Sequence, residues 1–155
     1  MDVLIRRIEE TTIPGVRVTA PGTAEPYNER YFRWTAFPIA STFKSSEIVC
    51  GMLEGWHHTP TFSEIEFHDD KELFYFTDGP AIMLFCQIRD GRPEADTCTL
   101  VRLEAGTELE IQAGVGHFIA VAEGEHFGAL VISPRQAAPR IQLPEEVRGY
   151  EIERK

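Results

Sequence analysis

Short apolar stretches separated by turn residues run along most of this chain, and helical periodicity is almost absent. The pairs Asp78-Gly79 and Asp90-Gly91 suit hairpin turns in which the backbone takes a positive φ. Many short strands with regular turns predict an all-β sandwich or barrel rather than a parallel α/β sheet. The predicted strands are Tyr31–Phe37, Glu47–Leu53, Thr61–His68, Glu72–Thr77, Ala81–Arg89, Cys98–Leu103, Thr107–Ile111, His117–Ala122 and His126–Ile132.

The two ends of the chain have a different pattern. Pro14, Pro21 and Pro26 stand among Thr and Gly, which predicts an extended N-terminal arm laid over the barrel. After Pro134 the chain is polar and contains more prolines, so one short helix or an edge strand is expected there. We therefore predict a single domain over residues 1–155, with an arm at 1–30, a barrel at 31–134 and a C-terminal tail at 135–155.

Composition narrows the class of protein. The chain has 155 residues, 43% of them hydrophobic, enough to bury a core. A net charge of −10 argues against nucleic acid and anionic membrane surfaces, which require clustered Lys and Arg. The N-terminus lacks the apolar run of a signal peptide. Cys50, Cys86 and Cys98 each lie in an apolar run, so we expect buried free thiols and a cytoplasmic, soluble protein.

Alternation along the third predicted strand divides its side chains between two faces. Glu64, Glu66 and His68 share one face, and Ile65 and Phe67 share the other. Taken alone, this pattern favours a solvated charged face over an apolar one.

The following strands point to a buried polar cluster instead. Glu72 is in phase with Phe74 and Phe76, and His117 is in phase with apolar neighbours further along its own strand. A carboxylate or an imidazole is costly to bury unless it is paired or bound to a metal. A tight turn places Glu72 across a hairpin from His68, so these side chains can meet.

Two spaced motifs contain these residues. The first is Glu66-x-His68-x3-Glu72-x6-Gly79, and Gly55 is a candidate for a leading glycine. It resembles the first motif of the cupin superfamily, with Glu66 where the first histidine usually stands.

The second motif, Gly106-x5-Gln112-x-Gly114-x2-His117, follows at a suitable separation. It resembles the second cupin motif, with Gln112 in place of proline. Together the motifs imply a double-stranded β-helix, the RmlC-like jelly-roll barrel, over most of the chain.

The resemblance also implies a divalent ion held by Glu66, His68, Glu72 and His117. Two carboxylates and two imidazoles suit Mn, Fe, Ni or Zn, and glutamate in place of histidine shifts the preference modestly towards Mn²⁺ or Fe²⁺. Since some cupins have lost their metal, a metal-free site is the alternative.

Three further residues are candidates for acid–base catalysis. Glu64 would lie beside Glu66 and could act as a base. His57 or His58 could act as an acid or base if their loop covers the mouth of the barrel, although a solvated loop is the simpler interpretation.

For function, the resemblance favours a metal-dependent lyase or isomerase acting on a small polar carboxylate or sugar acid. A narrower likeness is to ureidoglycolate lyases, carried by Glu66-x-His68, Glu72-Leu-Phe74 and the segment ending Gly116-His117. There Gly116 replaces a tryptophan, which predicts a wider pocket, and the implied reaction is metal-assisted elimination of urea. A non-enzymatic small-molecule-binding module and an Fe-dependent dioxygenase stay open as alternatives.

We also expect a homodimer. If Glu66 and His68 turn inward, Ile65 and Phe67 turn outward and need cover from a partner or from the N-terminal arm.

Overall fold

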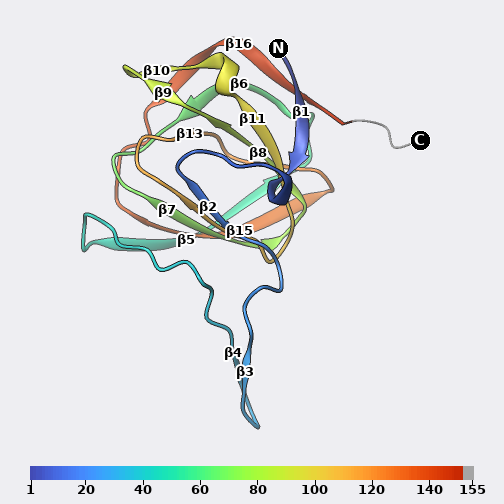
Figure 1. The fold of residues 1–155 in the computed structure, drawn as a ribbon, viewed down its shortest axis with the longest axis vertical. Coiled ribbons are helices and arrows are strands. Elements are labelled where there is room, and N and C mark those ends of the chain that lie inside the picture. Colours follow the sequence, from blue (N-terminus) through green and yellow to red (C-terminus); the bar gives the residue numbers. More distant parts are fainter. Residues whose placement is uncertain (152–155) are drawn as a thin grey trace.

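The computed structural model describes residues 1–151, which form two β-sheets packed face to face (Figure 1). A seven-stranded sheet has the order β11-β1-β16-β6-β13-β8-β14, and a five-stranded sheet has the order β2-β12-β7-β15-β5. The larger sheet contains β1 (Asp2–Arg7), β6 (Thr61–Glu66), β8 (Ala81–Cys86), β11 (Thr99–Leu103), β13 (Gly116–His117), β14 (Val121–Ala122) and β16 (Arg140–Tyr150). The smaller contains β2 (Val16–Thr19), β5 (Ile48–Trp56), β7 (Glu72–Asp78), β12 (Glu108–Ile111) and β15 (His126–Pro134).

Short elements complete the structure. Two small hairpins join β3 (Tyr27–Asn28) to β4 (Arg33–Trp34) and β9 (Ile88–Arg89) to β10 (Arg92–Pro93). Two single-turn 3₁₀ helices, η1 and η2, span Ile8–Glu10 and Ala95–Thr97. Among the described residues, no helix has the length and apolar character that crossing a bilayer requires.

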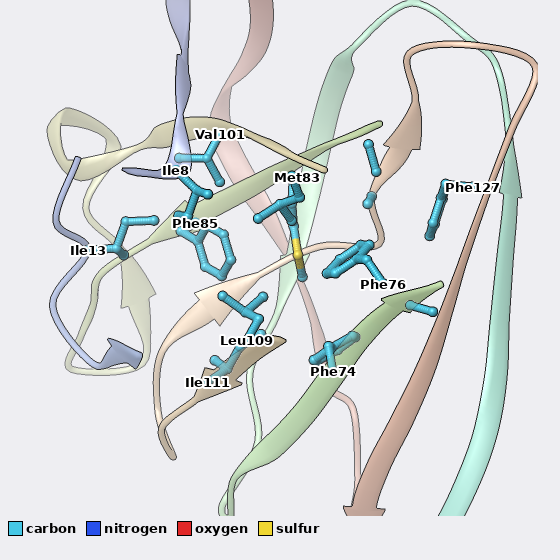
Figure 2. Close-up of a cluster of buried hydrophobic side chains, with 14 of the residues drawn as sticks. Ile8, Ile13, Phe74, Phe76, Met83, Phe85, Val101, Leu109, Ile111 and Phe127 are labelled. Carbon is cyan, nitrogen blue, oxygen red and sulfur yellow. The ribbon is translucent and has the colours of Figure 1, made fainter. Parts of the chain in front are cut away.

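A first hydrophobic core fills the space between the two sheets (Figure 2). Alternation along β7 turns Phe74 and Phe76 inward, and the facing strand β8 contributes Met83 and Phe85. β12 contributes Leu109 and Ile111 to this core, and β15 contributes Phe127.

A second core lies on the other face of β8. It contains Ile82, Leu84 and Cys86, whereas Ala81, Met83 and Phe85 belong to the first core. Both faces of β8 are therefore buried, which explains its uninterrupted apolar sequence. The second core is enclosed because β8 pairs with β11 as well as with β13, and the larger sheet closes on itself through β1, β16 and β6.

The ends of the chain differ from the sequence-based prediction. β1 lies between β11 and β16, and β2 pairs with β12, so residues 1–30 contribute strands to both sheets. β16 lies between β1 and β6, which makes it an interior strand, and residues 152–155 of the predicted tail lie outside the described part. The barrel thus extends beyond 31–134 in both directions. The β3–β4 hairpin, by contrast, stands away from the barrel as an arm (Figure 1).

Three predictions about exposure and strand position are corrected. Only Arg33–Trp34 of the predicted strand Tyr31–Phe37 is a strand, because this segment pairs with the short β3 and with neither large sheet. Cys50 is exposed rather than buried, since it lies on the edge strand β5. Ile65 is buried in the second core opposite Ile141 of β16, so no partner is needed to cover it. Of the two expected sources of cover, the N-terminal segment contributes Val3 and Ile5 to this core.

Candidate metal centre

The four predicted ligands meet at one end of the first core. Glu66 ends β6, His68 follows in the next loop, Glu72 begins β7 and His117 lies on β13. The ladder pairs His117 directly with Glu66, and Glu72 is in phase with inward-facing Phe74. His68 is 6% exposed and His117 is 2% exposed, so both imidazoles are removed from bulk water.

The polar atoms of this cluster are close enough to share one ion. Glu72 Oε2 lies 3.0 Å from His117 Nε2 and 3.1 Å from His68 Nε2. Glu66 Oε1 is 4.0 Å from His68 Nε2, and one potential ligand atom from each of Glu66, His68 and His117 falls within 4.8 Å of the others. Glu66, His68 and His117 therefore form a possible ion site, and Glu72 lies against both of its imidazoles.

Backbone carbonyls orient both imidazoles. His68 Nδ1–H donates to the carbonyl oxygen of Ala137 at 2.8 Å, and His117 Nδ1–H donates to that of Val115 at 3.0 Å. In the neutral imidazoles this leaves both Nε2 lone pairs facing Glu72. Lone pairs that converge on a carboxylate require a cation between them, either protons or a metal ion.

His68 Nε2 shows this requirement most clearly. It is buried and, within residues 1–151, has no hydrogen-bond partner of good geometry despite its 3.1 Å distance to Glu72. A buried polar atom without a partner is unusual in a folded protein. The donor set and this unpaired nitrogen both fit a divalent ion held by nitrogen and oxygen ligands.

The same contacts determine the charges of Glu72 and His68. Burial opposes ionisation of Glu72, but its short contacts with the imidazoles of His117 and His68 outweigh it and lower the pKa of Glu72 to about 2. Burial alone would lower the pKa of His68, yet its contacts with Glu72 and Ala137 raise it to about 8. Without metal, an anionic carboxylate holds a proton on a neighbouring imidazole. With metal, the ion replaces that proton.

Asp70 fixes the loop that carries His68, and sequence reasoning did not identify it. Its carboxylate accepts the backbone N–H groups of Lys44 at 2.7 Å and Lys71 at 2.8 Å, and its own N–H donates to Gln136 Oε1 at 2.9 Å. Burial raises the pKa of Asp70, but these N–H donors outweigh it and lower that pKa. The available signal was an acidic pair at the turn directly after His68.

The position of His117 has a different cause from the one that we predicted. Its strand is broken between β13 and β14, so Ile119 is exposed and Val121 belongs to the second core rather than sharing the face of His117. The imidazole is nevertheless buried because the β13 ladder seats it between Glu66 and Phe85.

Glu64 lies beside the cluster on the same face of β6 as Glu66. Its carboxylate accepts hydrogen bonds from Arg140 at 2.9 Å and from Gln142 at 3.2 Å, both on β16. Arg140 is the ladder partner of Glu66, so it is the guanidinium nearest in register to the candidate ligands. Sequence reasoning did not select Arg140, because β16 was not recognised as an interior strand.

His57 and His58 are not brought to this cluster. His57 Nδ1–H donates to the carbonyl oxygen of Ala122, which pairs with Ala81 at the start of β8, whereas His117 pairs with Phe85. Four residues of strand correspond to roughly 13 Å. Both histidines line a separate hollow of about 210 Å³, to which none of the four candidate ligands contributes.

Gly116 does not widen the site, contrary to the prediction. A Cβ there would lie 2.7 Å from the carbonyl oxygen of Cys86 and 2.9 Å from side-chain atoms of Ile65 and Ile88. These atoms are on the side of the second core, away from the imidazole of His117. Glycine is needed so that β13 can approach β8 closely.

A larger hollow lies elsewhere. It has a volume of about 560 Å³ and is lined by residues of β1 and β11, including Arg6, Arg7 and Arg102. Arg102 is engaged by Glu104 at 2.6 Å and also by Glu123. None of the four candidate ligands lines this hollow. The candidate metal centre is therefore identified by its converging side chains and not by the size of a cavity.

No protein-family model matches the sequence, and no curated protein matches it. Solved structures do match. A dTDP sugar isomerase from Desulfovibrio desulfuricans G20 has a TM-score of 0.54 at 12% identity, covering 85% of each chain. The 3,4-ketoisomerase QdtA from Thermoanaerobacterium thermosaccharolyticum, a single-residue mutant in complex with TDP-4-keto-6-deoxyglucose, has a TM-score of 0.53 at 14% identity, covering 84% of this chain and 88% of that one.

RmlC from Streptococcus suis, in complex with dTDP-D-xylose, has a TM-score of 0.50 at 12% identity and covers 84% of this chain and 68% of that one. At these identities the likeness concerns the fold. The predicted all-β fold, an RmlC-like jelly-roll barrel, is confirmed.

Proposed function

Because the chain has the RmlC-like cupin fold, we propose that it is a metal-dependent isomerase or lyase acting on a small, anionic, sugar-like substrate. The proposed ligands are Glu66, His68, Glu72 and His117. The observation that carries the proposal is the buried convergence of the Nε2 atoms of His68 and His117 on one oxygen of Glu72, with no hydrogen-bond partner of good geometry for His68 Nε2 within residues 1–151. A purely structural cluster would have to hold a proton on that nitrogen, in line with the pKa of His68 raised to about 8, whereas a divalent ion would satisfy it directly.

The ligand set indicates which ions suit the site. Two carboxylates and two imidazoles leave coordination positions for substrate and favour Mn²⁺ or Fe²⁺ among Mn, Fe, Ni and Zn. When bound, a divalent ion supplies Lewis-acid polarisation of a substrate carbonyl or hydroxyl oxygen.

Residues beside the ligands supply binding and proton transfer. Arg140 lies opposite Glu66 and is half exposed, so its guanidinium can exchange Glu64 for a carboxylate or phosphate of the substrate. This exchange would release the Glu64 carboxylate, which could then accept a proton as general base. His57 and His58 lie too far along β8 for this role in the present arrangement.

The substrate class rests on fold-level analogy together with the charge of the site. Two of the similar structures contain TDP-sugars, which are anionic and carry vicinal oxygens. The elimination of urea that the ureidoglycolate lyase likeness implies stays a narrower prediction, as does the cytoplasmic location.

Metal content of the purified protein tests the proposal. Protein prepared without a histidine tag or chelator is expected to carry about one equivalent of Mn, Fe, Ni or Zn by elemental analysis. His117→Ala should lose this metal, whereas the matched control Glu64→Gln should keep it. Metal-free wild type and control, with unchanged folding, would contradict the four-ligand site.

Turnover on TDP-sugars and small hydroxy acids distinguishes an enzyme from a binding module. Turnover that is abolished by chelation and restored by metal supports the proposal. Turnover that survives complete metal removal would favour a metal-free isomerase using the Glu72–His117 pair, whose atoms are 3.0 Å apart, for proton transfer. Binding without turnover of any compound would favour the non-enzymatic module.

The assembly that accompanies this function is a homodimer. The β3–β4 hairpin makes only two residue pairs and stands away from the barrel, and such a hairpin has little stability on its own. Arg30 and Arg33 give it a local positive charge in a chain of net charge −10. The edge of β5 is unpaired within residues 1–151, and a second copy can cover both elements. The exposed aromatic residues of the hairpin are Tyr27, Tyr31, Phe32 and Trp34.

A further inference from the structure

Two of the three cysteines face each other across the ladder that joins β8 to β11. The antiparallel register pairs Phe85 with Thr99 and Leu84 with Leu100. One further step in each direction places Cys86 opposite Cys98. Side chains directly opposite each other in an antiparallel pair have Cβ atoms about 4.5–5.5 Å apart, and disulfides join residues whose Cα atoms are about 4.4–6.8 Å apart.

Both thiols lie on the same side of the sheet. Cys86 belongs to the second core, and Cys98 packs against that core. The N–H of Cys98 donates to the carbonyl oxygen of Ala95 at 3.2 Å instead of to β8. The two residues therefore form the narrow kind of cross-strand pair, which brings side chains closest together.

The surroundings of Cys86 favour its reactive form. The neighbouring Cys98 thiol outweighs burial and lowers the pKa of Cys86 to about 7, while the Cys86 sulfur also contacts the carbonyl oxygens of Gln87 at 3.4 Å and Glu94 at 3.3 Å. The same contact and burial raise the pKa of Cys98. Thr97 Oγ1 lies 3.7 Å from Cys86 Sγ. At neutral pH a thiolate can therefore lie beside a protonated thiol.

Access to the pair is asymmetric. Cys86 is 1% exposed, whereas Cys98 is half-buried at the end of η2. A small oxidant can reach the pair from the side of Cys98, while the core shields Cys86 from larger reagents. The third cysteine, Cys50, is exposed on β5 in the other sheet and provides an internal comparison.

We propose that Cys86 and Cys98 form a redox pair that closes a reversible disulfide between β8 and β11. Hydrogen peroxide oxidises one thiol to a sulfenic acid and is itself reduced to water. The sulfur of the second thiol attacks the sulfenic sulfur, the S–S bond forms, and hydroxide leaves with the thiol proton as a second water. Two thiols and one peroxide thus give one disulfide and two waters, and a dithiol reductant reverses the change.

The position of the pair links it to the candidate metal centre. Cys86 is the ladder partner of Gly116, and the adjacent Phe85 is the partner of His117. A disulfide would join β11 covalently to the strand that seats this imidazole. The redox pair itself does not depend on the proposed metal, so the two proposals can fail independently.

Oxidation of the purified full-length chain tests the proposal. After peroxide treatment and denaturing alkylation, wild type should take one alkyl group, at Cys50, whereas reduced protein takes three. The mass of the intact protein, measured without alkylation, should fall by two hydrogen atoms on oxidation. A dithiol reductant should restore the original mass. Tandem mass spectrometry should identify a peptide that links Cys86 to Cys98.

Three variants control the result. On oxidation, Cys50→Ser should still lose two hydrogen atoms. Cys98→Ser and Cys98→Ala should lose none. Circular dichroism should show that each variant is folded. The proposal is overturned if oxidised wild type keeps three alkylatable thiols, if it links chains through Cys50, or if Cys86 gains oxygen without forming the disulfide.

Discussion

At Glu72 a single carboxylate oxygen lies within 3.1 Å of two buried imidazole nitrogens. Strand alternation alone indicated that this glutamate would face the core, because Phe74 and Phe76 share its phase. The depressed pKa of Glu72 and the raised pKa of His68 are the two sides of one interaction. Their effect on stability can therefore be measured by titration in the absence of metal.

The contribution of Glu72 and His68 to the stability of the metal-free protein should be greatest between about pH 4.5 and 6.5. The pKa of Glu72 falls from 4.5 to about 2 on folding, so its contribution is present above pH 4.5 and is lost as the pH falls through 2. The pKa of His68 rises from 6.5 to about 8, so its contribution is present below pH 6.5 and is lost as the pH rises through 8. Thermal melts in chelator from about pH 2 to about pH 8 measure both limbs.

Glu72→Gln should flatten both limbs because the amide carries no charge. Glu64→Gln, on a neighbouring carboxylate outside the cluster, should leave them unchanged. Equal profiles for wild type and Glu72→Gln would show that the pair contributes nothing to stability.

Among the elements, the loop between β6 and β7 determines how well the site is organised. His68 is in this loop, and its backbone carbonyl accepts the N–H of Gly114 at 2.9 Å. Gly114 has a φ of +79°, a conformation that glycine adopts without strain, which gives a physical reason for glycine at this place in the motif. Asp70 holds the other end of the loop against residues 44–45.

Replacing Asp70 by alanine should loosen this loop. It leaves partly buried N–H groups without their acceptor, which costs about 1 kcal/mol of unfolding free energy. Metal affinity should fall roughly 10–100-fold, as expected for residues that orient ligands. Urea denaturation and metal titration measure the two effects. The control is Asp69→Ala, because Asp69 is exposed and should tolerate the change within about 0.5 kcal/mol. Similar effects from both substitutions would contradict a special role for Asp70.

For the whole molecule, the closure of the larger sheet by β1 and β16 changes the argument for a dimer. Ile65, which first suggested a missing partner, is covered by the chain's own C-terminal strand. The uncovered apolar surface is instead on the β3–β4 hairpin and along the edge strand β5. The expected assembly is unchanged, but the surface that forms it is different.

Sedimentation velocity should find a dimer for wild type and a shift towards monomer for the double variant Phe32→Ser/Trp34→Ser. Removing two exposed aromatic anchors from an interface should weaken association by at least about tenfold, since each residue of this kind can contribute about 2 kcal/mol or more. Tyr150→Ser, at an exposed aromatic residue on β16, should not change the distribution. A monomeric wild type at all concentrations would exclude the homodimer.

The sequence by itself determined the strand class, the positions of most strands and the four candidate ligands. The strands follow from alternation with a period of two, and the ligands from the resemblance of two spaced motifs to the cupin motifs. Both patterns are local properties of the chain. Only the tertiary structure decided that β1 and β16 enclose a second core, that Gly116 faces this core, and that His57 and His58 lie at the other end of β8. The physical reason is that a strand's own residues specify which face is apolar, whereas its neighbours are chosen by long-range pairing across the whole fold.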